Sequence, residues 1–448
     1  MMKLAVIFES SPFDRKGLFN AVHNRVKHLI ATGECEIDVY CVHSRDNAFT
    51  RKLRHTPSVP SVDSVTIDGI VYKMLWYRFS ILDYALLEKL HVRPWLFRRF
   101  LSSHVGLLKG YDAVVAHSFS GALFAYKAGV PYYVTWHGSD VHTHPWRVPV
   151  ILEDTKTVME SARCNFFVSK ALMEASDRIT VHARKEVLYN GVSEDFVEFS
   201  PAEKASVRGR YGLSPEDKVV AFVGNLVPVK NVMVLPELFA KIASGFSARF
   251  EAGSLKFWIV GDGKLRSSLE AAFAHHGFDL ITGHPGQDDP NQRPSASHSQ
   301  LDRGSLPLSF RPNEVSGEIR LFGNVPPADM PGIMNCVDLL VLPSLNEGLP
   351  LVCAEALRCG ADVVGSDVGG ISEVIGEANV VPLGDGFIDA LSAKALSYLA
   401  ARAVDATPIL ASGLVPLPGS VSGGSRQPLS EDFSWPRTAA RELDFLKF

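Results

Sequence analysis

Two glutamates, Glu347 and Glu355, have seven residues between them in a stretch that reads NEGLPLVCAE. The apolar run over 337–342 predicts a buried strand before them, which ends at Pro343. A helix is expected next, with Pro350 near its first turn, because a missing N–H costs nothing there. A strand that leads into a helix N-terminus offers free backbone N–H groups and a partial positive charge. This arrangement suits an anion such as a diphosphate.

The distance between the two glutamates argues against a catalytic carboxylate pair. If both lay on one regular helix, eight residues of rise would separate them by roughly 12 Å. Glycosidases need about 5 Å between their two carboxyl groups for retention, or roughly 6.5–9.5 Å for inversion. Two separate contacts along one extended ligand fit the spacing better, and two ordinary solvated side chains are the plain alternative.

Two other strand-to-helix turns carry residues suited to phosphate. In VGNLVPVKN (223–231) the glycine permits close backbone approach, and Lys230 stands at the expected start of a helix. In GDGK (261–264) a second glycine-rich turn ends in a lysine. Either turn alone is typical of an ordinary surface loop. Neither has P-loop spacing, and no GxGxxG follows the first strand, so the ATP and NAD signatures are absent.

His137 lies at the end of a predicted strand in TWHGSD (135–140), where it would point into a cleft between domains. Two other interpretations stay open: a core histidine with satisfied hydrogen bonds, or a turn built by Gly138 and capped by Asp140. Gly17, between the first strand and the first helix, is likewise open to being only a turn residue.

Strands and helices alternate along the chain, which argues for mainly parallel sheets. Strands are expected over 4–8, 37–42, 113–117, 132–138, 219–224, 255–261, 320–323, 337–342 and 361–367, and helices over 17–31, 122–128 and 231–242. A charged stretch over 201–215 interrupts the series before it restarts. The expected fold class is therefore α/β, with two Rossmann-like doubly wound domains facing a central cleft and ligands beyond the carboxyl ends of the strands.

The expected domains are an N-terminal one over 1–198 and a C-terminal one over 199–432, followed by a closing helix over 433–448 that packs back on the first domain. Residues 283–317 and 411–428 are rich in Pro, Ser and Gly without periodicity. That composition predicts disordered segments, because it holds too little apolar surface to build a core.

The composition is that of a soluble globular protein, since 46% of the 448 residues are hydrophobic and 21% are charged. A net charge of −4 argues against a general nucleic-acid partner. Six scattered cysteines without a CxxC pair argue against zinc and disulfide frameworks and favour reduced thiols in the cytoplasm. The start, MMKLAVIFES, predicts a first strand rather than a signal peptide, and no apolar run approaches the ~20 residues of a membrane span.

Together these pieces resemble glycosyltransferase family 4, the retaining enzymes of the GT-B fold that use nucleotide-sugar donors. Each piece is short, and their common order and spacing carry the resemblance over most of the chain. The pieces are the loop at Gly17, WHGSDV (136–141), VSKAL (168–172), YNGVSEDF (189–196), VGNLVPVKN, VGDGK (260–264), LFGNV (321–325), NEGLPLVCAEAL (346–357) and VGGISEV (368–374).

The resemblance implies a role for each matching residue at a nucleotide sugar. Glu355 would hold the ribose hydroxyls of the donor nucleotide, and Glu347 the hydroxyls of the transferred sugar. Lys230 would neutralise the diphosphate as it leaves. His137 would face the sugar near the reacting carbon, and Gly17 would let the backbone approach the diphosphate. The catalytic set implied is thus His137, Glu347 and Lys230.

Backbone amides and one departure from the family pattern complete the implied donor site. Gly348, Leu349 and Leu351 offer the amides beside the first glutamate. Asn225 stands where the family often has arginine, so a second cation for the phosphates is missing at that position. Either Lys230 and helix dipoles suffice for the phosphates, or Lys264 or another residue compensates.

The expected activity is transfer of a hexose-type sugar from a UDP- or GDP-sugar to a glycan or lipid-linked acceptor, as in bacterial surface-polysaccharide assembly. The resemblance implies retention of the anomeric configuration. No cofactor and no metal are expected, because the acidic pair Asp288-Asp289 lies in the insertion over 283–317. A GT-B sugar-nucleotide epimerase and an inactive nucleotide-sugar-binding module, for which Asn225 is the only hint, are the alternatives.

Residues 74–101 interleave aromatic side chains with Arg and Lys in an N-terminal region that is basic overall. A basic amphipathic helix with Trp and Phe is typical of a peripheral contact with a membrane surface. An ordinary packed helix whose arginines face solvent is the alternative. The expected location is the cytoplasm, at the inner face of the cell membrane if this contact forms.

Overall fold

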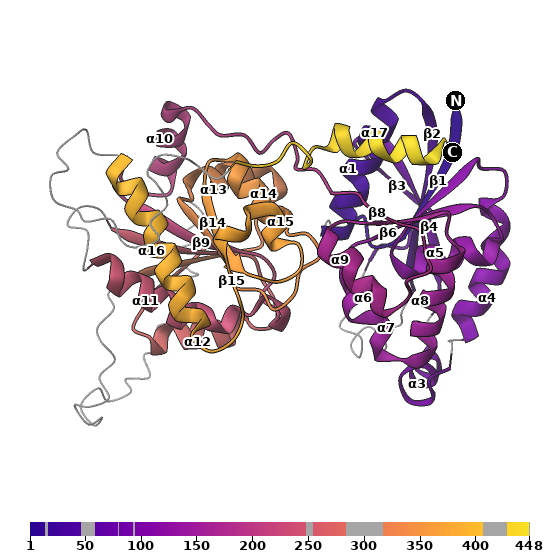
Figure 1. The fold of residues 1–448 in the computed structure, drawn as a ribbon, viewed down its shortest axis with the longest axis horizontal. Coiled ribbons are helices and arrows are strands. Elements are labelled where there is room, and N and C mark those ends of the chain that lie inside the picture. Colours follow the sequence, from indigo (N-terminus) through magenta and orange to yellow (C-terminus); the bar gives the residue numbers. More distant parts are fainter. Residues whose placement is uncertain are drawn as a thin grey trace. The chain divides into compact units, whose positions relative to one another are not determined.

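The computed structural model describes residues 1–13, 17–45, 59–78, 80–92, 95–247, 254–283, 317–405 and 428–447. The chain divides into two compact units. The N-terminal unit comprises Met1–Ser193 with Glu431–Phe448, and the C-terminal unit comprises Glu194–Ser430 (Figure 1). The sequence predicted a domain boundary near residue 199, and the structure divides the chain after Ser193. Most of the two predicted disordered segments, including Asp288-Asp289, lies outside the described residues.

The N-terminal unit is built on an eight-stranded sheet in the order β3-β4-β2-β1-β5-β6-β7-β8. All neighbouring strands run parallel except the β3–β4 pair. The central strands are apolar on both faces because helices cover both sides of the sheet. The strands are β1 (Met2–Glu9), β2 (Cys35–Ser44), β3 (Ser64–Ile67), β4 (Ile70–Tyr77), β5 (Ala113–His117), β6 (Tyr132–Trp136), β7 (Cys164–Phe167) and β8 (Lys185–Val187).

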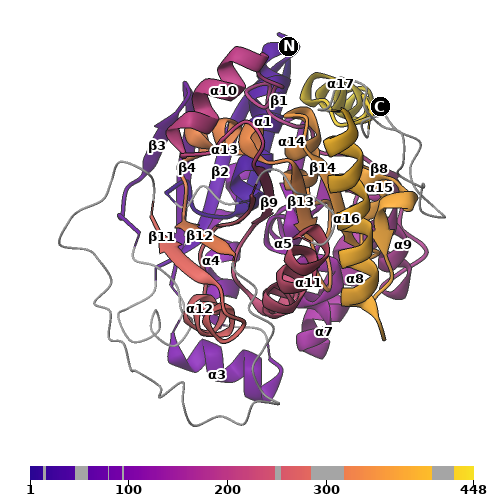
Figure 2. The same cartoon turned by 90° about the vertical axis from the view of Figure 1, so that its left-hand side faces the viewer.

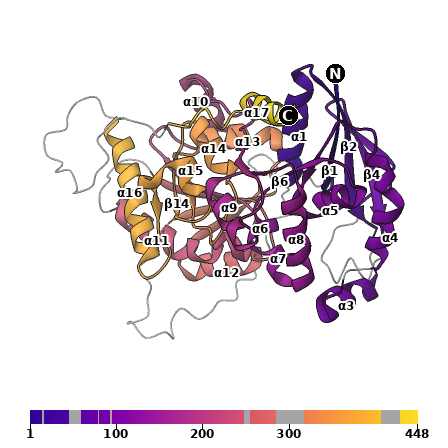
Figure 3. The same cartoon turned by 45° about the vertical axis from the view of Figure 1, so that its right-hand side comes forward.

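Helices pack on both faces of this sheet. Figure 3 shows α1 and α17 together on one side, with α4, α5 and α8 on the other. The helices are α1 (Gly17–Ala31), α3 (Ile81–Leu90), α4 (Trp95–His104), α5 (Ser118–Ala128), α6 (Ser139–His142), α7 (His144–Arg147), α8 (Pro149–Ser161), α9 (Lys170–Ala175) and α17 (Trp435–Leu446), with short 3-10 turns at Val105–Leu108 and Ser176–Arg178.

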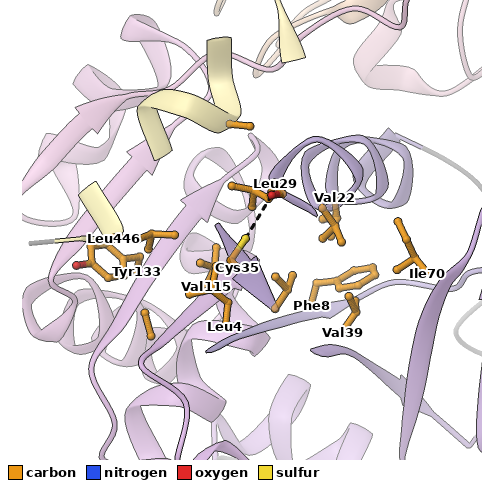
Figure 4. Packing of buried hydrophobic residues seen from close by; sticks show 14 of the residues in the cluster. Leu4, Phe8, Val22, Leu29, Cys35, Val39, Ile70, Val115, Tyr133 and Leu446 are labelled. Carbon is orange, nitrogen blue, oxygen red and sulfur yellow. Dashed lines mark hydrogen bonds between the residues drawn. The ribbon is translucent and has the colours of Figure 1, made fainter. Parts of the chain in front are cut away.

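The last helix, α17, completes the core of the N-terminal unit. Leu443 and Leu446 join the buried cluster between α1 and the sheet, and Figure 4 shows Leu446 beside Tyr133. Burying each leucine contributes about 1.5–3 kcal/mol. The start of α17 is packed as closely, because a Cβ on Gly191 would lie 2.2 Å from the backbone N of Trp435. The chain therefore needs glycine in its YNGV segment to admit this helix.

A buried ion pair joins α17 to α1. Arg25 Nε lies 3.6 Å from Glu442 Oε2, and the two side chains are 1% and 0% exposed. The guanidinium also donates to Thr135 Oγ1 at 2.7 Å and to Asn190 Oδ1 at 3.2 Å. Neither carboxyl oxygen of Glu442 has a hydrogen-bond partner within the described chain. Burial consequently raises the pKa of Glu442 and lowers that of Arg25.

The C-terminal unit is built on a seven-stranded parallel sheet in the order β11-β12-β10-β9-β13-β14-β15. Figure 2 shows α11 and α16 side by side on this unit, and Figure 1 shows α13 and α14 on the opposite side of the strands. The strands are β9 (Lys218–Val223), β10 (Leu255–Val260), β11 (Asp279–Thr282), β12 (Glu318–Gly323), β13 (Leu339–Leu342), β14 (Asp362–Ser366) and β15 (Val380–Val381).

Helices lie on both faces of this sheet. They are α10 (Pro201–Arg210), α11 (Leu235–Ser247), α12 (Arg266–His275), α13 (Met330–Cys336), α14 (Leu351–Arg358), α15 (Ile371–Ile375) and α16 (Phe387–Asp405), with 3-10 turns at Pro228–Lys230, Val232–Val234, Pro327–Asp329 and Glu377–Asn379. Two mainly parallel sheets, each covered by helices on both faces, confirm the predicted α/β class.

Three predicted helices are wrong in their bounds. The helix expected over 122–128 begins at Ser118. The helix expected from Asn231 begins at Leu235, because Asn231 takes a left-handed conformation (φ 52°) between two 3-10 turns. The amphipathic helix expected within 74–101 is divided. Residues 74–77 finish strand β4, and α3 then starts after Ser80, whose side chain accepts the backbone N–H of Asp83. A left-handed His91 ends α3 before α4 begins.

The described part of the chain holds no helix that is both long enough and apolar enough to cross a membrane. All six cysteines are buried and free, so none of them forms a disulfide.

Candidate functional site

Lys230 and Glu347 form the centre of the candidate site in the C-terminal unit. Lys230 Nζ donates to Glu347 Oε1 at 2.6 Å, and the two side chains are 21% and 9% exposed. Both residues follow the carboxyl ends of neighbouring strands, β9 and β13. A charge-assisted hydrogen bond this short and this well shielded is stronger than a surface ion pair. The structure thus brings together a cation and a carboxylate that the chain separates by 117 residues.

Neighbouring groups hold Glu347 in place from two sides. Ser344 Oγ donates to the same oxygen, Glu347 Oε1, at 2.6 Å, and Ser366 Oγ donates to the carbonyl of Ser344. A Cβ on Gly369, where φ is +53°, would lie 1.9 Å from the carbonyl oxygen of Glu347. The VGG turn therefore needs glycine because it packs against the backbone that carries this carboxylate.

Glu355 lies on α14, a little more than one turn from its start, whereas Glu347 precedes the helix. Pro350 is the N-cap and no side chain caps the helix, so its first N–H groups are open to an anion. Gly348 and Leu349 are partly exposed in the loop, and Leu351 is the first helical residue. Burial raises the pKa of Glu355 to about 7. A carboxyl whose pKa is raised this far is typical of a functional site.

The two glycine-rich turns pack against each other. Leu226 N donates to Asp262 O at 2.9 Å, and a Cβ on Gly263 would lie 2.4 Å from Leu226 O. Close backbone packing therefore accounts for the glycines of the second turn without a ligand. Asn225 and Lys264 are both exposed on these turns, beyond the ends of β9 and β10.

His137 lies in the N-terminal unit, one residue beyond the end of β6, and is partly exposed. Its backbone is fixed by Asp140, which accepts the N–H groups of His137 at 3.1 Å and of Gly138 at 2.8 Å. The turn that the sequence offered as an alternative is thus present, together with a histidine that is not fully enclosed. Desolvation raises the pKa of Asp140 to about 6 and lowers the pKa of His137 to about 3.

His117, which the sequence did not single out, is the partner of His137. Its Nδ1 lies 3.0 Å from His137 Nε2, and the side chain is 1% exposed. The pairing follows from the sheet order, because β5 and β6 are neighbours and His117 is opposite Thr135. On the next strand, Glu9 accepts hydrogen bonds from Tyr77 Oη at 2.8 Å and from Ser120 Oγ. The only signal in the sequence was a histidine at the end of a predicted strand.

Gly17 is the first residue of α1, and the three residues before it lie outside the described chain. A Cβ at this position would meet no atom within 4 Å, so packing inside the unit does not require glycine there. Of the predicted site residues, Gly17 and His137 belong to the N-terminal unit. Lys230, Asn225, Glu347–Leu351 and Glu355 belong to the C-terminal unit.

Among the described residues, no group of three or more His, Cys, Asp or Glu side chains is arranged to hold a metal ion.

Solved structures share this architecture along the whole chain. Sucrose-phosphate synthase from Thermosynechococcus elongatus superposes with a TM-score of 0.60 at 15% identity, covering 100% of this chain and 95% of that one. HepE from Anabaena, solved in complex with UDP and glucose, gives a TM-score of 0.57 at 15% identity, covering 100% and 97%. At such identities these likenesses establish the fold, which is GT-B.

Two family models match the sequence itself. "Glycosyl transferase 4-like domain" matches residues 17–191, within the N-terminal unit, and "Glycosyl transferases group 1" matches residues 298–401, which include Glu347 and Glu355. Each half of the chain is thus similar to the glycosyltransferase domain that its model describes, on a fold that is GT-B.

The curated relatives are distant and match only in part. The putative teichuronic acid biosynthesis glycosyltransferase TuaC of Bacillus subtilis (strain 168) is 26% identical over 258 residues, which are 58% of this chain and 52% of that protein. The 2-deoxystreptamine glucosyltransferase of Streptomyces kanamyceticus is 26% identical over 277 residues, 58% of each. The chain therefore spans little more than half the length of these curated relatives.

Proposed function

We propose that this protein transfers a hexose-type sugar from a UDP- or GDP-sugar to a glycan or lipid-linked acceptor, with retention of the anomeric configuration and without a metal. The observation that carries the proposal is the Lys230–Glu347 pair, held at the carboxyl ends of β9 and β13 beside the uncapped start of α14. Ligands of open parallel sheets bind at this edge. The neighbouring fold of HepE, solved with UDP and glucose, supports a nucleotide-sugar donor.

In this proposal the C-terminal unit lowers the barrier by stabilising the leaving group. A departing nucleoside diphosphate gains negative charge as its bond to the sugar breaks. The ammonium of Lys230 and the first N–H groups of α14 would meet that charge. Removing one fixed donor of this kind typically costs about 2.7–4 kcal/mol of transition-state stabilisation. The site would achieve this with side chains and amides, in keeping with metal-independent transfer.

The two glutamates would grip different ends of the donor. Glu347, already oriented by Lys230 and Ser344, has its second oxygen left to accept a sugar hydroxyl. Glu355 would accept hydrogen bonds from the ribose hydroxyls, which would offset part of the cost of ionising a partly buried carboxyl. His137 is assigned to the sugar near the reacting carbon, as the contribution of the N-terminal unit. Gly17 is assigned to the diphosphate.

The acceptor is proposed to be membrane-proximal, since helices α3 and α4 expose an apolar and basic surface. Leu82, Leu90 and Trp95 are 68%, 65% and 58% exposed, and the guanidinium of Arg99 lies 5.7 Å from the centre of the Trp95 ring. Such a surface suits the headgroup region of an anionic membrane. The teichuronic acid relative supports a surface polysaccharide as the product. The protein would then act at the cytoplasmic face of the membrane.

The membrane contact is tested with the whole protein and vesicles of neutral or anionic lipid. Binding should require anionic lipid, weaken in high salt and fall when Arg98 and Arg99 are both changed to glutamate. Equal binding to both vesicle types, or no binding to either, would remove this part of the proposal while leaving sugar transfer intact.

Sugar transfer is tested by incubating the protein with a panel of nucleotide sugars and measuring released UDP or GDP. Lys230→Ala and Glu347→Gln should each lower the rate by about 10²-fold or more. Lys241→Ala is a matched control, because Lys241 forms an exposed ion pair with Asp389 in the same unit. Full activity in the presence of EDTA is expected, and a rate restored only by added divalent metal would contradict metal independence.

Two other outcomes would point to the alternatives. If the protein binds nucleotide but releases no UDP or GDP from any donor, an inactive binding module is favoured. The exposed Asn225 is the residue that suggests this alternative. In that case Asn225→Arg, which restores the usual cation, should not create activity either. A changed sugar still attached to its nucleotide would favour an epimerase.

A further inference from the structure

Two histidines meet at the ends of adjacent strands in the N-terminal unit. His117 is the last residue of β5, and His137 follows the last residue of β6. One ring nitrogen from each, His117 Nδ1 and His137 Nε2, lie 3.0 Å apart, and the rings are stacked with centroids 5.3 Å apart. The inner ring is fully buried whereas the outer ring is partly exposed.

The environment keeps both rings neutral. Burial lowers the pKa of His117 well below its usual value, and the neighbouring His137 and Arg25 add to the effect. Burial followed by Arg25 lowers the pKa of His137 to about 3. Each ring therefore carries one N–H, and a single proton lies between the two facing nitrogens. The ring that carries that proton decides whether Nδ1 of His137 offers a ligand an N–H donor or an unprotonated acceptor.

The buried ring nitrogen His117 Nε2 indicates which of the two rings carries this proton. Within the described part of the chain, His117 Nε2 is buried and has no hydrogen-bond partner. If His137 donated, His117 would have to carry its own proton on Nε2, as a buried N–H with nothing to receive it. If His117 donates, Nε2 is only a bare acceptor. Orphaned buried N–H groups are rarer in proteins than unsatisfied acceptors, so donation by His117 is favoured.

We propose that His117 is a positioning residue that donates its Nδ1–H to His137 Nε2 and so holds His137 as the tautomer with its proton on Nδ1. Within the described residues, His137 Nδ1 has no hydrogen-bond partner. Asp140 fixes the backbone of the same residue. His137 would thus offer a rigid N–H donor to an oxygen of the sugar or acceptor and would not serve as a general base. This inference rests on the proposed function for its ligand, although the tautomer itself does not.

The tautomer is measured on the whole protein labelled with ¹⁵N-histidine, where protonated and bare ring nitrogens give separate signals. The signals of His137 are assigned by their loss in His137→Asn. We expect a protonated Nδ1 and a bare Nε2. A protonated Nε2 on His137, or a doubly protonated ring at neutral pH, would overturn the proposal. Because the measurement needs no substrate, it gives its answer even if no donor is ever turned over.

Two variants of the inner histidine that are isosteric with each other sharpen the test. His117→Asn keeps an N–H donor and should preserve the tautomer of His137, whereas His117→Asp offers only acceptors and should move the proton to Nε2. Transfer should stay close to wild type in the first and fall by about tenfold or more in the second. His275→Asn, at an exposed position of the other unit, should change neither signal.

The variants also separate positioning from mere packing. Loss of activity in both with the tautomer unchanged in both would refute a donating role for His117. If His117→Asp does not fold, the wild-type spectrum together with His117→Asn still decides the question. If the wild-type protein shows the expected tautomer but transfers no sugar, the pair stands and the proposed function fails.

Discussion

Changing Glu355 to glutamine is expected to stabilise the C-terminal unit at alkaline pH and to weaken its binding of nucleotide. Burial raises the pKa of Glu355 to about 7 from its usual 4.5. Ionising a carboxyl at about 7 instead of 4.5 costs about 3 kcal/mol, since one pKa unit corresponds to about 1.4 kcal/mol. Glutamine has nearly the same shape and carries no charge, so it should remove this cost.

The sign of the effect follows from the direction of the pKa change. Between pH 4.5 and about 7 the folded chain binds the proton more tightly than the unfolded chain, so stability falls as the pH rises through this window. The free energy of unfolding of Glu355→Gln should therefore exceed that of wild type by about 3 kcal/mol above pH 8 and by less than about 1 kcal/mol at pH 5.

The measurement is urea unfolding at about pH 5 and pH 8, with hydrogen exchange of peptides from β13 and β14 to assign the transition to this unit. Glu377→Gln, at an exposed position of the same unit, is the control and should show no such dependence. In parallel, calorimetry should show that the affinity for UDP or GDP falls by about tenfold or more, because hydrogen bonds to a charged group are lost. If the stability difference is the same at both pH values, the raised pKa of Glu355 is refuted. If the affinity for UDP or GDP is unchanged, the contact between Glu355 and the ribose is refuted.

Three further changes test packing described above. Gly369→Ala should lower transfer by about 10²-fold at near-normal nucleotide affinity, because its Cβ would displace the backbone of Glu347; a normal rate would contradict this. Glu442→Gln should destabilise the N-terminal unit by about 3 kcal/mol or more, since it leaves Arg25 charged and buried, while Arg25→Met with Glu442→Leu should cost less in urea unfolding. Leu443→Ala should cost about 2–5 kcal/mol in the same assay, and a smaller loss would mean that α17 is loosely held.

The sequence predicted the regular elements well where an apolar pattern ends sharply. The helix over 17–31 and the strand over 113–117 occur with the predicted bounds. The helix start at Leu235 was missed because a left-handed Asn231 is a local backbone choice that hydrophobic periodicity does not record. The division of 74–101 was missed for a similar reason. A strand tail and two short helices share aromatic and basic residues, and the capping box at Ser80 was the overlooked signal.

From the sequence, only those parts of the site could be predicted that are formed by residues close together in the chain. The strand-to-helix turn before Glu355 is a short-range feature, and Ser344, three residues before Glu347, could have been found in the same way. The bond between Lys230 and Glu347 depends on β9 and β13 being neighbours, which their distance in the chain does not reveal. His117 required the same knowledge for β5 and β6. Sheet order, rather than residue type, was the missing information.

The position of α17 has a consequence for how this chain is made. The N-terminal unit draws its last core helix from residues 435–446, and the whole C-terminal unit is encoded between that helix and β8. On a ribosome, which releases a chain from its N-terminus, the first unit must therefore wait with the face of α1 uncovered until the second has been synthesised. The second unit, continuous in sequence, is the first able to complete its own core. A chain cut short just before residue 435 would thus lack part of the core of the N-terminal unit, although its C-terminal unit would be complete.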